Sequence, residues 1–133
     1  MRLIGFAAVF VLLLVATHAG ERSVANAASD GKSIFNTNCA TCHQENGMGS
    51  PGVFPPLAGN KDVTAKDPAK VIGIVLHGLN TPITVNGKQY SGGMPSWKGT
   101  LSNADIAAVL TYVRSSWGND APAVTEKMVS AVK

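Results

Sequence analysis

The chain contains two cysteines, Cys39 and Cys42, which are separated by two residues, and His43 follows directly. This Cys-x-x-Cys-His spacing is the one to which a c-type haem is attached. Two thiols at this spacing on a turn of helix can reach the vinyl groups on neighbouring edges of one porphyrin, and each then forms a thioether. The adjacent histidine points its imidazole at the iron from the same side. The motif therefore predicts one covalent haem c, held by Cys39 and Cys42 and ligated by His43.

Other uses of the cysteine pair are a structural disulfide, which suits an exported chain, a thioredoxin-like dithiol and a zinc site. The dithiol needs a βαβ context, which the sequence does not show. Zinc needs two further ligands, and the chain has three histidines but no third cysteine. Haem attachment explains the adjacent histidine as well as the pair, so we favour it.

A second axial ligand for the iron is available at Met48, His77, Met94 or Met128. Met48 follows the motif so closely that it belongs to the histidine side, and Met128 is near the C-terminus. His77 ends a predicted helix, where the helix dipole alone favours a histidine, and bis-histidine ligation stays open. Met94 lies in a Gly-Gly-Met-Pro loop with enough chain before it to cross the haem edge. We predict Met94 as the sixth ligand, a soft thioether that raises the reduction potential.

The elements that must position these side chains are helices, a hairpin and two long loops. Their expected ranges are helices at 31–37, 68–77 and 102–117, a hairpin at 83–90, and Gly/Pro-rich loops at 44–60 and 92–97. An Asn-Gly pair between β-prone residues favours the tight hairpin turn. Loops of that length in a small domain normally wrap around something. The sequence thus predicts an all-α domain with a small β-hairpin insert.

Local signals mark the ends of the predicted helices. Polar side chains that can cap a first turn are Ser29, Asp30, Asp67 and Ser102, and glycines that can end a helix are Gly78 and Gly118. The third helix also has an acidic residue three positions after its cap, which predicts a capping box.

The N-terminus is expected to be a targeting segment. Arg2 is followed by an unbroken apolar run over residues 3–16, which is shorter than the roughly 20 residues that span a bilayer. A basic start, a short apolar stretch and an Ala-Asn-Ala site are typical of a secretory signal peptide. We predict a signal peptide at residues 1–27 with cleavage after Ala27. Cleavage after Ala19 is the second choice, and an uncleaved anchor is the open alternative.

The composition is that of one small domain. The 133 residues are 14% charged and 45% hydrophobic, with a net charge of +3. The basic residues are scattered, without a dense run or interleaved aromatics, so no nucleic-acid partner is expected. We assign the domain to residues 28–118 and expect a C-terminal tail at 119–133 with one weak amphipathic stretch.

Several segments resemble the class I cytochrome c family, and more narrowly its small bacterial mono-haem members. Beside the haem motif, Gly31 and Phe35 match the first-helix positions at which the family's first and last helices cross. Val109 and Tyr112 match the partners on the last helix. The resemblance extends over nearly all of the chain after the leader. It implies the cytochrome c fold, with three to four helices wrapped around one covalent haem.

Two loop segments carry the same resemblance. Residues 55–59, Pro-Pro-Leu-Ala-Gly, are similar to the family's Pro-x-Leu-x-Gly segment. The match implies that the Pro55 carbonyl accepts a hydrogen bond from His43 Nδ1 and that Leu57 packs on the haem. Met94-Pro95 is similar to the family's loop that carries the distal ligand. The hairpin at 83–90 is similar to an insert in cytochrome domains that serve larger oxidoreductases.

The predicted function is electron transfer between a redox-protein donor and acceptor, without enzyme activity and without a small-molecule substrate. Two filled axial sites leave the iron no open position for a substrate, whereas outer-sphere transfer needs none. Two alternatives stay open: a haem subunit or domain of a larger membrane oxidoreductase such as a respiratory complex, and a haem enzyme or ligand sensor with a labile sixth site. The export signal predicts a periplasmic protein, or a membrane-anchored one if the leader is retained.

Four further side chains have two interpretations each. Tyr90 and Trp97 are candidate haem-pocket or propionate contacts, with ordinary packing as the equal alternative. Lys88 and Lys98 flank the methionine loop and can steer an acidic partner, with a solvated surface as the equal alternative.

Overall fold

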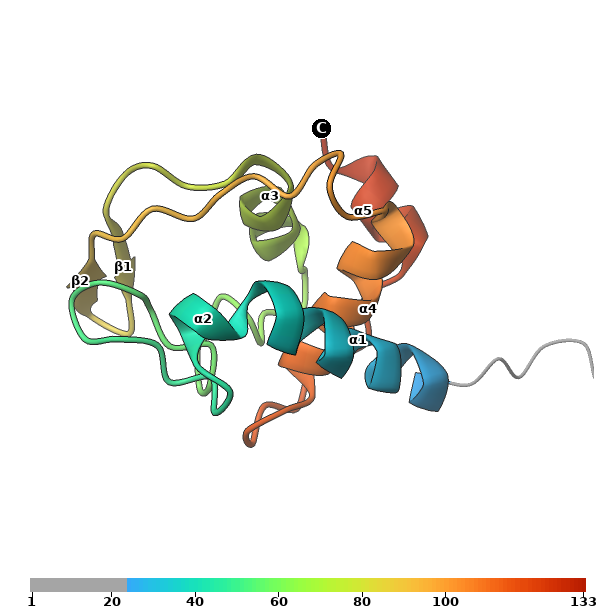
Figure 1. The fold of residues 1–133 in the computed structure, drawn as a ribbon, viewed down its shortest axis with the longest axis horizontal. Helices are drawn as coiled ribbons and strands as arrows, with labels where there is room; N and C mark the ends of the chain where they lie inside the picture. Colours follow the sequence, from blue (N-terminus) through green and yellow to red (C-terminus); the bar gives the residue numbers. More distant parts are fainter. Residues whose placement is uncertain (1–23) are drawn as a thin grey trace, which may run out of the picture.

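The computed structural model describes residues 24–133, with side chains from Asp30 onward. These residues form α1 (Val24–Asn38), α2 (Ala40–His43), α3 (Ala69–His77), β1 (Ile83–Val85), β2 (Lys88–Tyr90), α4 (Asn103–Arg114) and α5 (Glu126–Ala131) (Figure 1). The helical architecture with one small hairpin is the predicted one. The described residues contain five helices, more than the three or four expected, because α2 forms at the haem motif and α5 forms near the C-terminus.

The first helix begins earlier than predicted. α1 starts at Val24, so Ser29 and Asp30 lie inside it and do not cap it. The alanine-rich stretch before them continues the helix, since alanine has the highest helix propensity. Most of the predicted leader and its second-choice cleavage site lie outside the described residues, while the site after Ala27 falls within α1. Within residues 24–133, no helix is long and apolar enough to cross a membrane.

The core is built around the crossing of α1 and α4 (Figure 1). Gly31 lies at the crossing, where a Cβ atom would overlap the carbonyl group of Ala108. One turn later, Phe35 is fully buried and its ring centroid lies 5.6 Å from that of Tyr112 and 5.1 Å from that of Trp117. The predicted contact between the first and last helices is confirmed, and the glycine permits the close approach of the two backbones.

The predicted C-terminal end of α3 and the start of α4 are confirmed, whereas α3 begins at Ala69, one residue later than predicted, with Pro68 and not Asp67 at the N-cap position. The Ser102 side chain accepts the N–H of Asp105, whose carboxylate accepts the N–H of Ser102, which completes the capping box. At α3, Asp67 Oδ1 accepts the N–H of Ala69 at 2.9 Å. Gly78 ends α3 with a φ of 75°, in the left-handed region that favours glycine.

The predicted end of α4 is wrong. The helix was expected to reach Trp117 with Gly118 as its cap, but it ends at Arg114. The hydroxyl groups of Ser115 and Ser116 donate to carbonyls of the preceding turn, which competes with continuation of the helix. Trp117 then takes a φ of 54°, and this left-handed conformation brings its indole ring onto the α1–α4 crossing.

The hairpin forms at the predicted position. Asn86 and Gly87 have φ values of 50° and 78°, as a tight primed turn requires. The turn is tied to the proline-rich loop, because Asn86 Nδ2 donates to the carbonyl oxygen of Gly59 at 3.0 Å. The strands lie at the end of the molecule opposite to α5 (Figure 1).

The C-terminal segment packs against α4. Val129 of α5 is 1% exposed. Arg114 is fully buried, and its guanidinium donates to the carbonyl of Pro122 at 2.9 Å and to that of Val63 at 2.5 Å. Burial lowers the pKa of Arg114, but a guanidinium stays charged at neutral pH. This side chain ties α4 to two distant loops.

Candidate haem site

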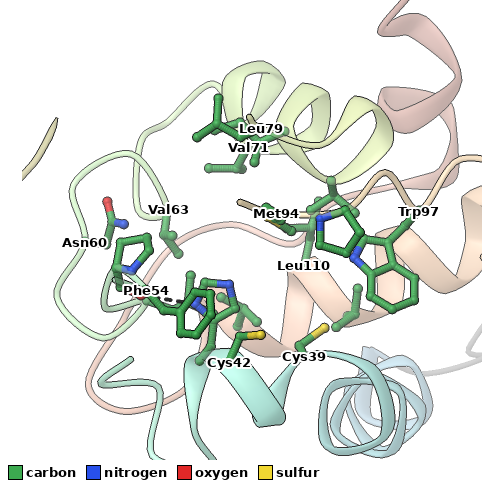
Figure 2. A pocket seen from close by; sticks show the side chains of 18 of the residues that line it. Cys39, Cys42, Phe54, Asn60, Val63, Val71, Leu79, Met94, Trp97 and Leu110 are labelled. Atoms are coloured by element: carbon green, nitrogen blue, oxygen red, sulfur yellow. Dashed lines mark hydrogen bonds between the residues drawn. The ribbon is translucent and has the colours of Figure 1, made fainter. Parts of the chain in front are cut away.

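A cavity lies between α2, α3, α4 and the loops that follow α2 and β2 (Figure 2). Most of its lining side chains are apolar, and α1, β1 and the turn after α3 contribute to the lining as well; the apolar residues include Phe35, Phe54, Leu57, Val63, Val71, Leu79, Val109 and Leu110. An apolar cavity of this kind suits a large flat hydrophobic group and excludes water from it.

α2 presents the cysteine pair to this cavity. The helix continues directly from α1, with Cys39 N–H donating to the Phe35 carbonyl at 2.8 Å. Figure 2 shows the sulfur atoms of Cys39 and Cys42 on the same side of α2, pointing into the cavity. The two are not joined by a disulfide. Burial, and to a lesser extent the charge of Cys42, raises the pKa of Cys39 to about 11, which disfavours a reactive dithiol because the thiolate is the nucleophile.

His43 is buried at the end of α2, with 8% of its surface exposed, and it lines the cavity. Its Nδ1 lies 3.1 Å from the carbonyl oxygen of Pro55. Because a carbonyl can only accept, Nδ1 carries the proton and Nε2 keeps its lone pair. Burial lowers the pKa of His43, although the hydrogen bond to Pro55 opposes this shift. The imidazole is therefore in the neutral form that ligates metals.

The loop after α2 fixes the carbonyl group that orients His43. The N–H of Gly49 donates to the His43 carbonyl at 2.9 Å, and the N–H of Leu57 donates to the Gly47 carbonyl at 2.7 Å. A Cβ atom at Gly49 would lie 2.6 Å from the Pro55 carbonyl oxygen, so this loop can close only with glycine there. Leu57 itself lines the cavity.

The structure brings one of the four candidate sixth ligands to the cavity. Met94 lines it and lies across it from the two cysteines in Figure 2. Met48 and Met128 are 56% and 41% exposed, and His77 is exposed at the end of α3. None of these three lines the cavity.

The remaining predicted residues differ in whether they line the cavity. Trp97 lines the cavity, whereas Tyr90 is buried in the hairpin and does not line it. Lys88 and Lys98 are both exposed. Asn60, which was not predicted from the sequence, also lines the cavity, with 5% of its surface exposed. Its position directly after the Pro-x-Leu-x-Gly segment was the available signal.

The residues present fit a haem c. Two thiols point into an apolar cavity from one helix, a neutral imidazole lies beside them, and a thioether lies opposite. Among residues 24–133, no group of three or more His, Cys, Asp or Glu side chains could hold a metal ion directly. A porphyrin attached to Cys39 and Cys42 would bring its own iron to this site.

A helical domain that closes on such a cavity, with Cys-x-x-Cys-His in its wall, is characteristic of c-type cytochromes. Comparison with known proteins identifies the family, since the family model described as cytochrome c matches residues 28–117. The chain belongs to the cytochrome c family, as a class I mono-haem member that carries covalent haem c. Members of this family are generally electron carriers and not catalysts.

Two relatives are forms of cytochrome c-552 from Thermus thermophilus. One is 42% identical over 99 residues, which cover 72% of this chain and 66% of the relative. The other is 43% identical over 94 residues, which cover 68% and 70%. The cytochrome c subunit of alcohol dehydrogenase (quinone) from Gluconobacter oxydans is 39% identical over 92 residues, covering 69% of this chain and 19% of the subunit. The chain thus spans about two thirds of the Thermus proteins and about a fifth of the subunit.

Proposed function

We propose that the protein transfers single electrons through a haem held by Cys39 and Cys42, with His43 and Met94 as axial ligands. The observation that carries the proposal is that a neutral imidazole and a thioether line the same apolar cavity, in which Met94 lies across from the two cysteines (Figure 2). The bound haem iron supplies one-electron redox chemistry. Of the four candidate sixth ligands, Met94 alone lines the cavity.

Side chains around the cavity then orient the ligands of the haem, enclose it and tune its properties. Pro55 fixes the ring plane and the tautomer of His43 and increases its basicity as a ligand. Leu57 and Trp97 pack at the haem and exclude water, while Tyr90 supports the hairpin beside the cavity. The same two axial ligands serve both oxidation states, so reorganisation on electron transfer is small. Such a site has no open position for a small-molecule substrate.

The donor and acceptor are redox proteins, and the protein works in the periplasm after removal of residues 1–27. Cleavage after Ala27 leaves Gly31 and Phe35, and with them the crossing of α1 and α4, in the mature domain. Lys88 and Lys98 are exposed on either side of the methionine loop and steer an acidic partner toward it.

A second candidate function is that of a cytochrome module of a membrane oxidoreductase. The similarity to the alcohol dehydrogenase cytochrome subunit supports it. The chemistry at the haem is the same, and the partner differs. Cell fractionation distinguishes the two: a mature protein that begins at Ala28 in the soluble periplasmic fraction supports the free carrier, and one that retains residues 1–27 in the membrane fraction supports the module.

Carbon monoxide binding to the reduced protein tests whether the sixth position is closed. With Met94 on the iron, the wild type should bind carbon monoxide slowly and incompletely, and Met94→Ala should bind it fully. Rapid, complete binding by the wild type would contradict the proposal. It would support a haem enzyme or ligand sensor with a labile sixth site.

A further inference from the structure

We propose that the C-terminal turn of α3 holds the sixth ligand in place, with Gly78 and Ser96 as the positioning residues for Met94. The inference rests on the proposed function, in which Met94 ligates the iron. It is carried by the hydrogen bonds and close contacts between the end of α3 and residues 94–98.

The segment after Met94 caps α3. The last carbonyl groups of a helix have no partners within the helix. Here the N–H groups of Trp97 and Lys98 donate to the Val75 and Leu76 carbonyls, at 3.0 and 3.2 Å. The Ser96 hydroxyl also donates to the Leu76 carbonyl, at 2.5 Å. These bonds join the methionine loop to the helix, so that displacement of the loop leaves the helix end uncapped.

The backbone of Met94 is itself paired with the residue that follows Gly78. The N–H of Met94 donates to the Leu79 carbonyl at 2.8 Å, and the N–H of Leu79 donates to the Met94 carbonyl at 2.9 Å. Both backbone polar groups of Met94 are therefore satisfied by one residue at the exit of α3. The direction of the Met94 side chain follows from where α3 ends.

Gly78 is the residue at which the end of α3 and the methionine loop approach each other most closely. A Cβ atom there would lie 2.6 Å from the Met94 carbonyl oxygen, 2.8 Å from the Ser96 nitrogen and 3.0 Å from the Pro95 carbonyl carbon. All three neighbours are backbone atoms, so no side-chain rotation relieves the overlap. The glycine thus ends α3 and also permits the methionine loop to pair with it.

The first test compares Gly78→Ala with Gly99→Ala in the haem-loaded protein. Both glycines have a positive φ, 75° and 83°, but a Cβ atom at Gly99 meets nothing within 4 Å. Both variants place alanine at a positive φ, and only Gly78→Ala adds the clash with the backbone of Met94, Pro95 and Ser96. We expect Gly78→Ala to lose most of the weak sulfur-to-iron charge-transfer band of the ferric form, and Gly99→Ala to keep it.

The second test does not depend on the folding of Gly78→Ala. Ser96→Ala removes one hydrogen bond of the cap, whereas Ser91→Ala, in the same loop, removes an exposed hydroxyl bond to the Gly52 carbonyl. Loss of one such bond shifts a local opening equilibrium by about fivefold. Carbon monoxide should therefore bind the ferrous Ser96→Ala protein about fivefold faster than the wild type, and the ferrous Ser91→Ala protein at the wild-type rate.

The outcomes separate this inference from the proposed function. If the wild type lacks the charge-transfer band, or if Met94→Ala keeps it, Met94 is not the ligand and both proposals fail. If Met94→Ala loses the band but Gly78→Ala and Ser96→Ala behave like their controls, the proposed function stands and the positioning by α3 is wrong.

Discussion

The closest backbone contact in the core makes Gly31→Ala the sharpest test of the fold. The new methyl group would overlap the Ala108 carbonyl oxygen and lie 2.8 Å from its carbon and 2.9 Å from Tyr112 Cβ. These atoms cannot move without separating α1 from α4, so we expect an overpacking cost at the upper end of the usual range, about 3 kcal/mol. The higher helix propensity of alanine offsets about 1 kcal/mol of this cost. The net loss is about 2 kcal/mol, a fall in melting temperature of about 8–16 °C for a domain of this size.

Gly73→Ala is the matched control, because Gly73 also lies inside a helix. Its Cβ atom would meet one atom of Val132 at 3.8 Å, an ordinary contact. Alanine there should stabilise the protein by about 0.5–1 kcal/mol. Thermal unfolding of the two haem-loaded variants, followed by far-ultraviolet circular dichroism, should give shifts of opposite sign. A Gly31→Ala protein that melts at or above the wild-type temperature would refute the close crossing of α1 and α4.

Three further predictions follow from other contacts. Arg114→Ala should lower the free energy of unfolding by about 3 kcal/mol, because a fully buried donor to two backbone carbonyls is lost; chemical denaturation measures this, and a change near zero would contradict it. Ser102→Ala should cost about 1 kcal/mol in the same assay through loss of the capping box. Replacing Lys88 and Lys98 by glutamine should slow electron transfer with an acidic redox partner and weaken its dependence on salt. A wild-type rate that does not change with ionic strength in stopped-flow measurements would exclude steering.

Features set by a few neighbouring residues could be predicted from the sequence. The hairpin follows from Asn86-Gly87, which take the positive φ values that a primed turn requires. The start of α4 follows from Ser102 and the acidic residue three positions later. The haem motif and the methionine loop are equally local, and the structure places both at one cavity.

Features that depend on distant contacts could not be predicted. The position of Trp117 after the end of α4 is one of them, since the indole packs on Phe35 of α1 and its Nε1 donates to the Glu45 carbonyl at 3.0 Å, a contact between residues far apart in sequence. The burial of Arg114 depends on its hydrogen bonds to the carbonyls of Val63 and Pro122, which lie in loops before and after α4 in the sequence. Tyr90 has an amphipathic aromatic side chain of the kind that lines pockets, and its hairpin partner Ile83 lines the cavity, but Tyr90 itself is buried outside the lining.

The central claim, a covalent haem ligated by His43 and Met94, is tested most directly by a visible absorption spectrum of the mature protein, oxidised and then reduced with dithionite. We predict a sharp c-type α-band on reduction and a weak sulfur-to-iron charge-transfer band in the oxidised form. An α-band without the sulfur band would contradict ligation by Met94. No haem band at all, in protein from a host competent for haem attachment, would contradict the whole account and return Cys39 and Cys42 to a thiol or disulfide role.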